Sequence, residues 1–204
     1  MSNAVADFET KYTKPKAIEP RRMTFQAFYK KYIDPGNSAA AGVKYEFCDG
    51  KIEKTTTMNR KELFIVRALT DFFYQLKYQV GSNIGGTVVN ELETWTSETN
   101  WRRPDWAYVT DAQINSGRAD DAIVPEFMVE MLSKNDDILV VQKKIYEYFR
   151  IGVKVLWIIY PQLRVVHVYT STKRITVCED DTDICSAAPV LPEFEISIYD
   201  LFKI

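Results

Sequence analysis

The sequence contains very little histidine and cysteine. Its 204 residues include one histidine, His167, and three cysteines, Cys48, Cys178 and Cys185. A single histidine excludes the histidine-rich zinc sites of many hydrolases, and a Ser-His-Asp or Cys-His catalytic site would depend on His167 alone. The odd number of cysteines and the lack of a C-x-x-C pair argue against a disulfide scaffold or a structural zinc site. His167 lies in residues 163–170, a segment typical of a strand, so we expect an ordinary structural role for it.

The chain also lacks long apolar runs and an excess of basic residues. No apolar stretch approaches the roughly 20 residues that span a membrane, and residues 1–22 contain no hydrophobic signal core. We therefore expect no membrane association and a cytoplasmic location. Lys and Arg number 26 and Asp and Glu number 28, giving a net charge of −2. This balance excludes the strong overall basicity of a protein that coats nucleic acid, although a local cleft can still be basic.

The composition that is present indicates a folded globular protein. Hydrophobic residues make up 46% of the sequence and charged residues 26%, an ordinary balance for a soluble domain. We expect a flexible N-terminal arm over residues 1–22 and a single domain over residues 23–204. Local signals predict a short helix over residues 24–32, and the Asp49-Gly50 pair between extended segments predicts a β-hairpin.

The rest of the chain alternates between segments typical of strands and of helices. Helical spacing predicts helices over residues 59–77 and 137–151, the second ended by Gly152. Strands are expected over residues 105–109, 127–132, 155–160, 163–170 and 173–178, and loops over 97–103 and 111–122. The strand–helix–strand unit over residues 127–160 should form a right-handed parallel crossover. We therefore predict an α/β or α+β fold in which helices flank a mixed β-sheet.

Two acidic residues stand out because of where they lie. Asp105 follows Pro104 at the start of a predicted strand, and Glu130 interrupts the apolar run Phe127–Leu132. A carboxylate in a buried strand is costly unless it is paired, hydrogen-bonded or bound to a metal. If the two strands converge at one edge of the sheet, their oxygens form a site suited to Mg²⁺ or Mn²⁺. The alternative is that a backbone amide or an arginine satisfies each carboxylate.

Further residues could approach these acids. Lys144 lies at the margin of the apolar stripe of the 137–151 helix, and Tyr148 follows one turn later on the same face. This lysine either leans toward the carboxylates or is a surface residue whose stem covers apolar atoms. Glu46 precedes the predicted hairpin turn and is either a site residue or an exposed strand residue.

The order and spacing of several short motifs resemble a known family. The chain carries, in sequence, Tyr45-Glu46-Phe47-Cys48-Asp49-Gly50, Pro104-Asp105, Val129-Glu130-Met131-Leu132-Ser133, Lys144-x-x-x-Tyr148-x-x-x-Gly152-Val153 and Leu156-Trp157-Ile158-Ile159-Tyr160-Pro161. This series resembles the Uma-type family of putative restriction endonucleases, a domain of unknown function in the PD-(D/E)XK nuclease superfamily. The resemblance covers roughly residues 24–202.

The resemblance implies a restriction-endonuclease-like core and metal-dependent hydrolysis of phosphodiester bonds. Asp105 and Glu130 match the acids of the superfamily, which would bind Mg²⁺ or Mn²⁺ together with the carbonyl of Met131. Leu132 stands where the superfamily usually has a lysine. In this family the lysine is moved to the following helix, and Lys144 fits that position.

The resemblance also implies auxiliary residues and partners. Glu46 matches an early acid that is often counted with the catalytic site. Arg102 and Arg103 are placed to meet phosphates, with a solvated loop as the simpler interpretation, and Tyr148 should lie near the site. DNA is the implied substrate, and nucleases of this superfamily commonly act as homodimers because two strands must be cut.

Three functions are compatible with the sequence. The first is a Mg²⁺-dependent DNA endonuclease. The second is a nucleic-acid-binding or scaffold protein that retains the nuclease fold without turnover, and the third is an unrelated carboxylate–metal hydrolase of a small phosphoester. The net charge does not separate these hypotheses.

Overall fold

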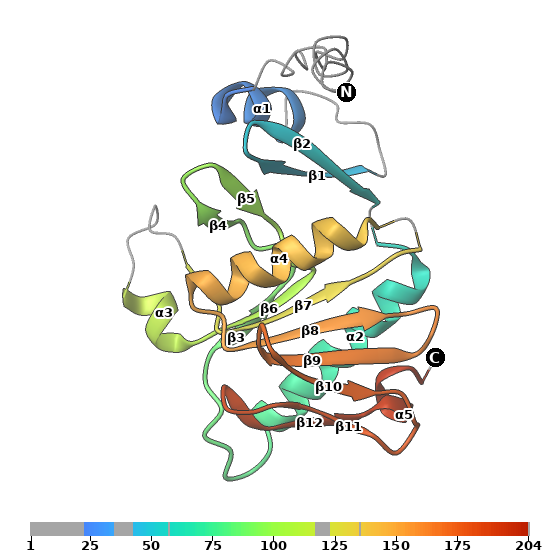
Figure 1. The fold of residues 1–204 in the computed structure, drawn as a ribbon. Coiled ribbons are helices and arrows are strands. Elements are labelled where there is room, and N and C mark those ends of the chain that lie inside the picture. The colour runs from blue at the N-terminus through green and yellow to red at the C-terminus, as the bar shows by residue number, and fades with distance from the viewer. Residues whose placement is uncertain (1–22, 35–42, 57, 117–122, 135, 204) are drawn as a thin grey trace, which may run out of the picture.

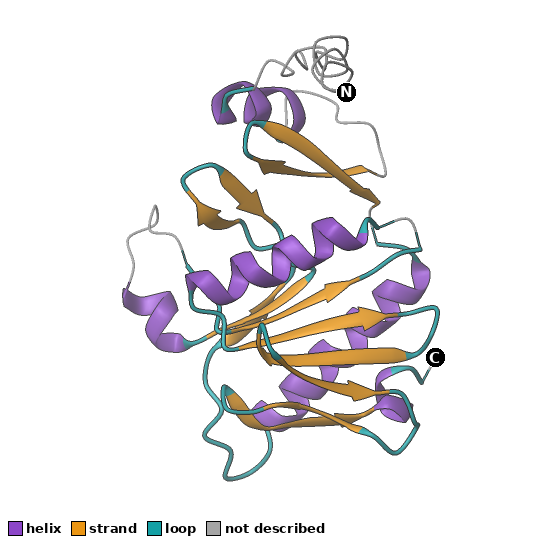
Figure 2. Ribbon diagram, in the orientation of Figure 1, coloured by secondary structure: helices purple, strands orange, loops and turns teal. Residues whose placement is uncertain are grey.

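The fold consists of a six-stranded mixed sheet, a separate four-stranded sheet and a C-terminal hairpin, with helices packed around them (Figures 1 and 2). The computed structural model describes residues 23–34, 43–56, 58–116, 123–134 and 136–203. The predicted arm over residues 1–22 lies outside the described residues and stays a prediction. The predicted class, a mixed sheet flanked by helices, is confirmed.

The larger sheet has the strand order β10-β9-β8-β7-β6-β3. Its strands are β3 (Thr87–Val89), β6 (Trp106–Val109), β7 (Phe127–Met131), β8 (Val155–Tyr160), β9 (Val165–Ser171) and β10 (Arg174–Cys178). Strands β7 and β8 pair in parallel, and the other neighbouring strands pair antiparallel. The parallel pairing expected across residues 127–160 is therefore confirmed, and His167 lies in β9 as expected.

Helices cover both faces of this sheet. Helix α4 (Ile138–Ile151) lies on one face, and α2 (Arg60–Lys77) lies on the other beside α5 (Ile198–Leu201) (Figure 1). Side chains of a strand point alternately to its two faces, so Val129 packs in the α2 core whereas Met128 packs against α4. This alternation puts the next residue, Glu130, on the α4 face.

The ends of the helices follow local signals in the sequence. Thr24 caps α1 (Phe25–Tyr32), and Asn59 caps α2 through a capping box. The side chain of Asp137 caps α4, which ends at Gly152 in the left-handed conformation with φ of 111°. Among the described residues, none of the helices combines the length and the apolar character that crossing a membrane requires.

The smaller sheet has the order β2-β1-β5-β4 and lies beyond α4 (Figure 1). Its strands are β1 (Val43–Cys48), β2 (Lys51–Thr56), β4 (Thr94–Ser97) and β5 (Asn100–Arg102). Phe28 of α1 packs against Tyr45, Phe47 and Trp101 on one face of this sheet. The alternate residues of β1 and β5 therefore point to the opposite face, toward α4.

Three segments differ from the sequence-based expectations. The expected loop over residues 97–103 contains β5, because Trp101 pairs with Phe47 of distant β1, a contact that no local pattern reveals. The expected loop over residues 111–122 begins with helix α3 (Asp111–Ser116), and residues 117–122 lie outside the described residues. The C-terminal hairpin of β11 (Ile184–Ala187) and β12 (Leu191–Ser197) was not predicted.

Candidate active site

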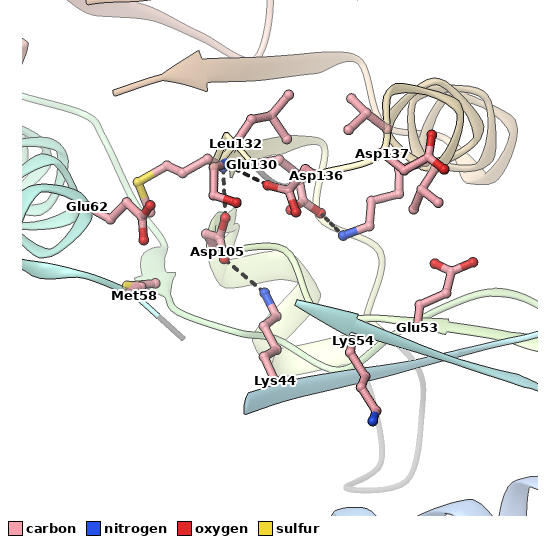
Figure 3. A pocket seen from close by; sticks show the side chains of 15 residues that line it. Lys44, Glu53, Lys54, Met58, Glu62, Asp105, Glu130, Leu132, Asp136 and Asp137 are labelled. Atoms are coloured by element: carbon pink, nitrogen blue, oxygen red, sulfur yellow. Dashed lines mark hydrogen bonds and ion pairs between the residues drawn. The ribbon is translucent and has the colours of Figure 1, made fainter. Parts of the chain in front are cut away.

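A pocket of about 230 Å³ lies where the β1–β2 hairpin faces the end of β7 and the first turns of α4. Charged side chains from five elements and from the segments that precede β6 and α4 line it: Lys44, Glu53, Lys54, Glu62, Asp105, Glu130, Asp136, Asp137 and Lys144. Figure 3 shows Asp105 between Lys44 and Glu130, with Lys54 pointing away from Asp105. The structure therefore brings Asp105, Glu130 and Lys144 together, as the sequence predicts.

Strand register explains why the two acids meet. Strands β6 and β7 are antiparallel neighbours in which Trp106 lies opposite Val129. Asp105 directly precedes β6, so continuing this register by one residue sets it opposite Glu130, and directly opposed side chains share a face. Both carboxylates therefore point to the α4 face of the sheet, where both are almost fully buried.

Asp105 is held by a lysine that the sequence analysis did not identify. Its Oδ1 accepts a hydrogen bond from Nζ of Lys44 at 2.8 Å, and its Oδ2 accepts one from the backbone N–H of Met131 at 2.7 Å. Burial would lower the pKa of Lys44, but nearby carboxylates, led by Asp105, raise it overall. Lys44 is therefore a buried, charged ammonium at the pocket. Its two-residue spacing from Glu46 on one strand face is the signal that could have found it.

Glu130 is bound by two side chains of α4. The hydroxyl of Tyr148 donates to its Oε1 at 2.6 Å, and Nζ of Lys144 lies 3.5 Å from the same oxygen. Burial raises the pKa of Glu130, and the charge of Lys144 only partly opposes this effect. Burial also raises the pKa of Tyr148, with the charge of Glu130 adding to it, so the phenol stays a hydrogen-bond donor.

Glu46 is fully buried rather than exposed, and both of its oxygens are used. Lys144 lies 3.0 Å from Oε1 and 2.9 Å from Oε2. The backbone N–H of Arg103 also donates to Oε1, and the guanidinium of Arg102 donates to Oε2. Glu46 therefore anchors Lys144, which lines the pocket, but is not itself among the residues that line it.

Arg102 is not placed as the phosphate contact suggested by its position in the sequence. Its side chain is fully buried, and it donates to Glu147 through Nε at 2.8 Å and Nη2 at 3.2 Å. Its Nη1 contacts Glu46 and Glu53. The guanidinium thus joins β5, β1, β2 and α4 beneath the pocket. Arg102 therefore supports the residues around the pocket and does not face solvent.

Arg103 is partly exposed and forms an ion pair with Glu91, with its guanidinium 5.8 Å from the centre of the Trp101 ring. Its side chain remains available at the surface, 24% exposed. A phosphate contact by Arg103 therefore stays a prediction, whereas the buried Arg102 is excluded from direct contact.

Glu62 is a further pocket residue that the sequence analysis missed. It completes the capping box of α2 by accepting the backbone N–H of Asn59. Burial raises the pKa of Glu62, and the charge of Asp105 adds to this effect. The capping pattern was visible in the sequence, but the direction of the start of α2 toward the pocket depends on tertiary packing.

The buried ion pairs of Glu46 predict an acid-sensitive stability. Burial would raise its pKa, but Lys144, Lys44 and Arg102 outweigh burial and lower it from 4.5 to about 2. A carboxyl with a lowered folded-state pKa stabilises the protein above its unfolded pKa, and this stabilisation is lost as the pH falls toward the folded pKa. The loss between pH 4.5 and pH 2 should amount to about 3 kcal/mol for this shift.

Urea unfolding between pH 6 and pH 2.5 checks this expectation. The stability of Glu46→Gln should decline less steeply with acid than that of the wild type, because the titrating group is gone. Glu193→Gln, at an exposed position of β12, serves as the control and should follow the wild-type curve. If the free energy of unfolding fell equally with acid in Glu46→Gln and in the wild type, the lowered pKa of Glu46 would be contradicted.

The donor set fits a hard divalent cation but does not enclose one. Among the described residues, no cluster of three or more His, Cys, Asp and Glu side chains is arranged to hold a metal ion. Asp105 and Glu130 nevertheless present adjacent carboxylates, and both hydrogen bonds to Glu130 reach Oε1, leaving Oε2 to serve as a ligand. Mg²⁺ often binds through one or two carboxylates and keeps several waters. A two-carboxylate site therefore suits this ion.

The mixed sheet thus carries Asp105 and Glu130 near the ends of neighbouring strands and Lys144 on the helix that follows β7. A crystal structure of a putative nuclease from Anabaena variabilis shares the fold, with a TM-score of 0.70 and 20% sequence identity. The similarity covers 89% of this chain and 98% of that chain. The sequence profile of the Uma2 family, described as putative restriction endonuclease, matches residues 26–199, and the chain belongs to this family. No curated protein gave a significant match to the chain.

Proposed function

We propose that this protein is a divalent-metal-dependent endonuclease that hydrolyses phosphodiester bonds of DNA. The observation that carries the proposal is that Asp105, directly before β6, and Glu130, on the neighbouring strand β7, line one pocket together with the buried lysines Lys44 and Lys144. Hydrolysis of a phosphodiester needs an activated water and positive charge that stabilises the transition state. Membership of a family described as restriction endonucleases supports the same reaction.

Asp105, Glu130 and the carbonyl of Met131 would hold the metal, Mg²⁺ or Mn²⁺. When bound, such an ion lowers the pKa of a coordinated water and polarises the phosphate. The backbone N–H of Met131 fixes the orientation of Asp105, and the hydroxyl of Tyr148 fixes that of Glu130. Tyr148 is fully buried, so its role is to orient Glu130 rather than to bind substrate.

Lys144 would hold Glu130 in place beside the attacking water. Glu46 holds the ammonium of Lys144 in place and is itself held by Arg102, so we assign Glu46 and Arg102 positioning roles. Arg103 is the candidate for a phosphate contact at the rim. Because one pocket carries one acid pair and duplex DNA has two strands, we also propose that the protein acts as a homodimer.

The proposal is tested by plasmid nicking together with metal binding. Supercoiled DNA is incubated with the wild type and with Asp105→Asn/Glu130→Gln in Mg²⁺, Mn²⁺ or EDTA, and Mn²⁺ is titrated into both proteins by calorimetry. We expect nicking by the wild type only with a divalent ion, and neither nicking nor Mn²⁺ binding by the variant.

The substitutions keep the shape of both side chains but remove their charge. Circular dichroism is therefore used to check that the variant is folded. Retained nicking by a folded variant would contradict the site. DNA binding without cleavage in either ion would instead favour the scaffold that retains the nuclease fold without turnover.

A further inference from the structure

Lys44 is a second buried lysine at the acid pair, and the reaction outlined above gives it no task. It comes from β1, whereas Lys144 comes from α4, so the two ammonium groups reach the acids from different elements. Both side chains are nearly inaccessible, at 5% and 8% exposed, and both line the pocket. Burying an ammonium costs free energy unless the group is paired and hydrogen-bonded, so the burial of Lys44 needs a physical reason.

The two lysines differ in how many of their donors the protein uses. An ammonium has three N–H donors. Nζ of Lys144 lies within 3.0 Å of both oxygens of Glu46 and 3.5 Å from Glu130. Within the described part of the chain, Nζ of Lys44 has a single hydrogen-bond partner, Oδ1 of Asp105 at 2.8 Å. Lys44 therefore keeps donors for a molecule in the pocket, whereas Lys144 is committed to its carboxylates.

The position of Lys44 suits a phosphate. Its partner Asp105 is one of the two proposed metal ligands, so a phosphate bound at the metal would also lie near this ammonium. Lysine acts as a compact point charge toward phosphate oxygens.

We propose that Lys44 contacts a non-bridging oxygen of a DNA phosphodiester in this pocket, while Lys144 serves to hold Glu46 and Glu130. This inference deepens the proposed function and rests on it for the identity of the substrate.

The salt dependence of DNA binding tests the division without requiring cleavage. A fluorescein-labelled 16-base-pair duplex is titrated with protein in EDTA at several NaCl concentrations, and anisotropy gives the binding constant. Removing one lysine–phosphate contact should lower the slope of log K against log salt by about one. We expect this reduction for Lys44→Met and an unchanged slope for Lys144→Met, the matched control with an equally buried lysine.

Two more variants distinguish the loss of the phosphate contact from unfolding of Lys44→Met. Lys44→Arg keeps a cation at the position and should retain the wild-type slope. Lys44→Met/Asp105→Asn removes the carboxylate that Lys44→Met would leave unpaired, and should show the same reduced slope in a folded protein. A slope that falls for Lys144→Met but not for Lys44→Met would overturn the proposal.

The outcomes separate this inference from the proposed function. If the wild type binds the duplex with the expected Lys44 dependence but never cleaves DNA, the contact stands and the endonuclease activity fails. Cleavage by the wild type with no change of slope for Lys44→Met overturns the contact alone. Failure of the wild type to bind the duplex in EDTA, or with Ca²⁺ added, overturns both.

Discussion

Replacing Arg102 with methionine should lower the free energy of unfolding by about 3–5 kcal/mol, the cost of breaking a buried ion pair from one side. The guanidinium is fully buried and contacts three glutamates from three different elements. Burial would lower the pKa of Arg102, but the three glutamates raise it overall. The side chain is therefore a permanent charge, and methionine removes it without leaving a large cavity.

Most of the lost stability should come from Glu147. Glu46 keeps the ammonium of Lys144 when Arg102 is removed, and Glu53 is partly exposed to water. Glu147 is 5% exposed and loses a two-pronged contact at 2.8 and 3.2 Å. Its other hydrogen bonds come from the neutral side chains of Thr96 and Asn100, and Lys143 lies 3.8 Å away. Much of the charge of Glu147 is therefore left without compensation.

Urea unfolding measures this effect, with Arg164→Met as the control. Arg164 pairs with Asp181, but both side chains are about half exposed, and such surface pairs contribute about 0–1 kcal/mol. For a chain of this size, the Arg102 variant should also melt roughly 6–20 °C lower. Equal, small losses in the two variants would show that the Arg102 contacts do not support the fold.

The acid pair could be predicted from the sequence because it depends on local patterns. Glu130 interrupts an apolar strand, and Asp105 begins another. When two such strands are neighbours, alternation of side chains decides which face each acid takes. Lys144 could be placed in the same way, because helical spacing sets it one turn from Tyr148 on the face toward the sheet.

The supporting charges could not be predicted, because their partners are far apart in the sequence. Arg102 was assigned to a loop, and only the pairing of β5 with β1 turns its side chain toward Glu46 and α4. Lys44 meets Asp105 across 61 residues. A lysine or arginine next to an aromatic residue has the same local pattern in an exposed strand as in this buried one. Sheet pairing, which the sequence does not specify locally, decides between the two.

Glu130→Gln should reduce metal-dependent cleavage by at least about a thousandfold, equal to about 4 kcal/mol of transition-state free energy, without lowering the stability of the fold. The amide keeps an oxygen that accepts from Tyr148, and Lys144 keeps both oxygens of Glu46. Burial raises the pKa of Glu130, so a neutral amide is easier to bury there than the ionised carboxylate. The substitution therefore removes a proposed metal ligand and little else.

Single-turnover plasmid cleavage in Mn²⁺ and urea unfolding should be measured on the same preparations, with Glu126→Gln as the control. Glu126 pairs with Lys154 at the surface, away from the pocket, so this variant should cleave at the wild-type rate. If Glu130→Gln lost stability and activity together, its carboxylate would be needed for folding, and the loss of cleavage could not be assigned to metal binding. If Glu130→Gln cleaved DNA at the wild-type rate, Glu130 would not be a metal ligand. Asp105, paired with Lys44, would then be the remaining carboxylate of the proposed metal site. We therefore expect a stable protein that no longer cleaves DNA. That result would show that the buried carboxylate of Glu130 serves metal binding rather than folding, although burying it costs solvation free energy.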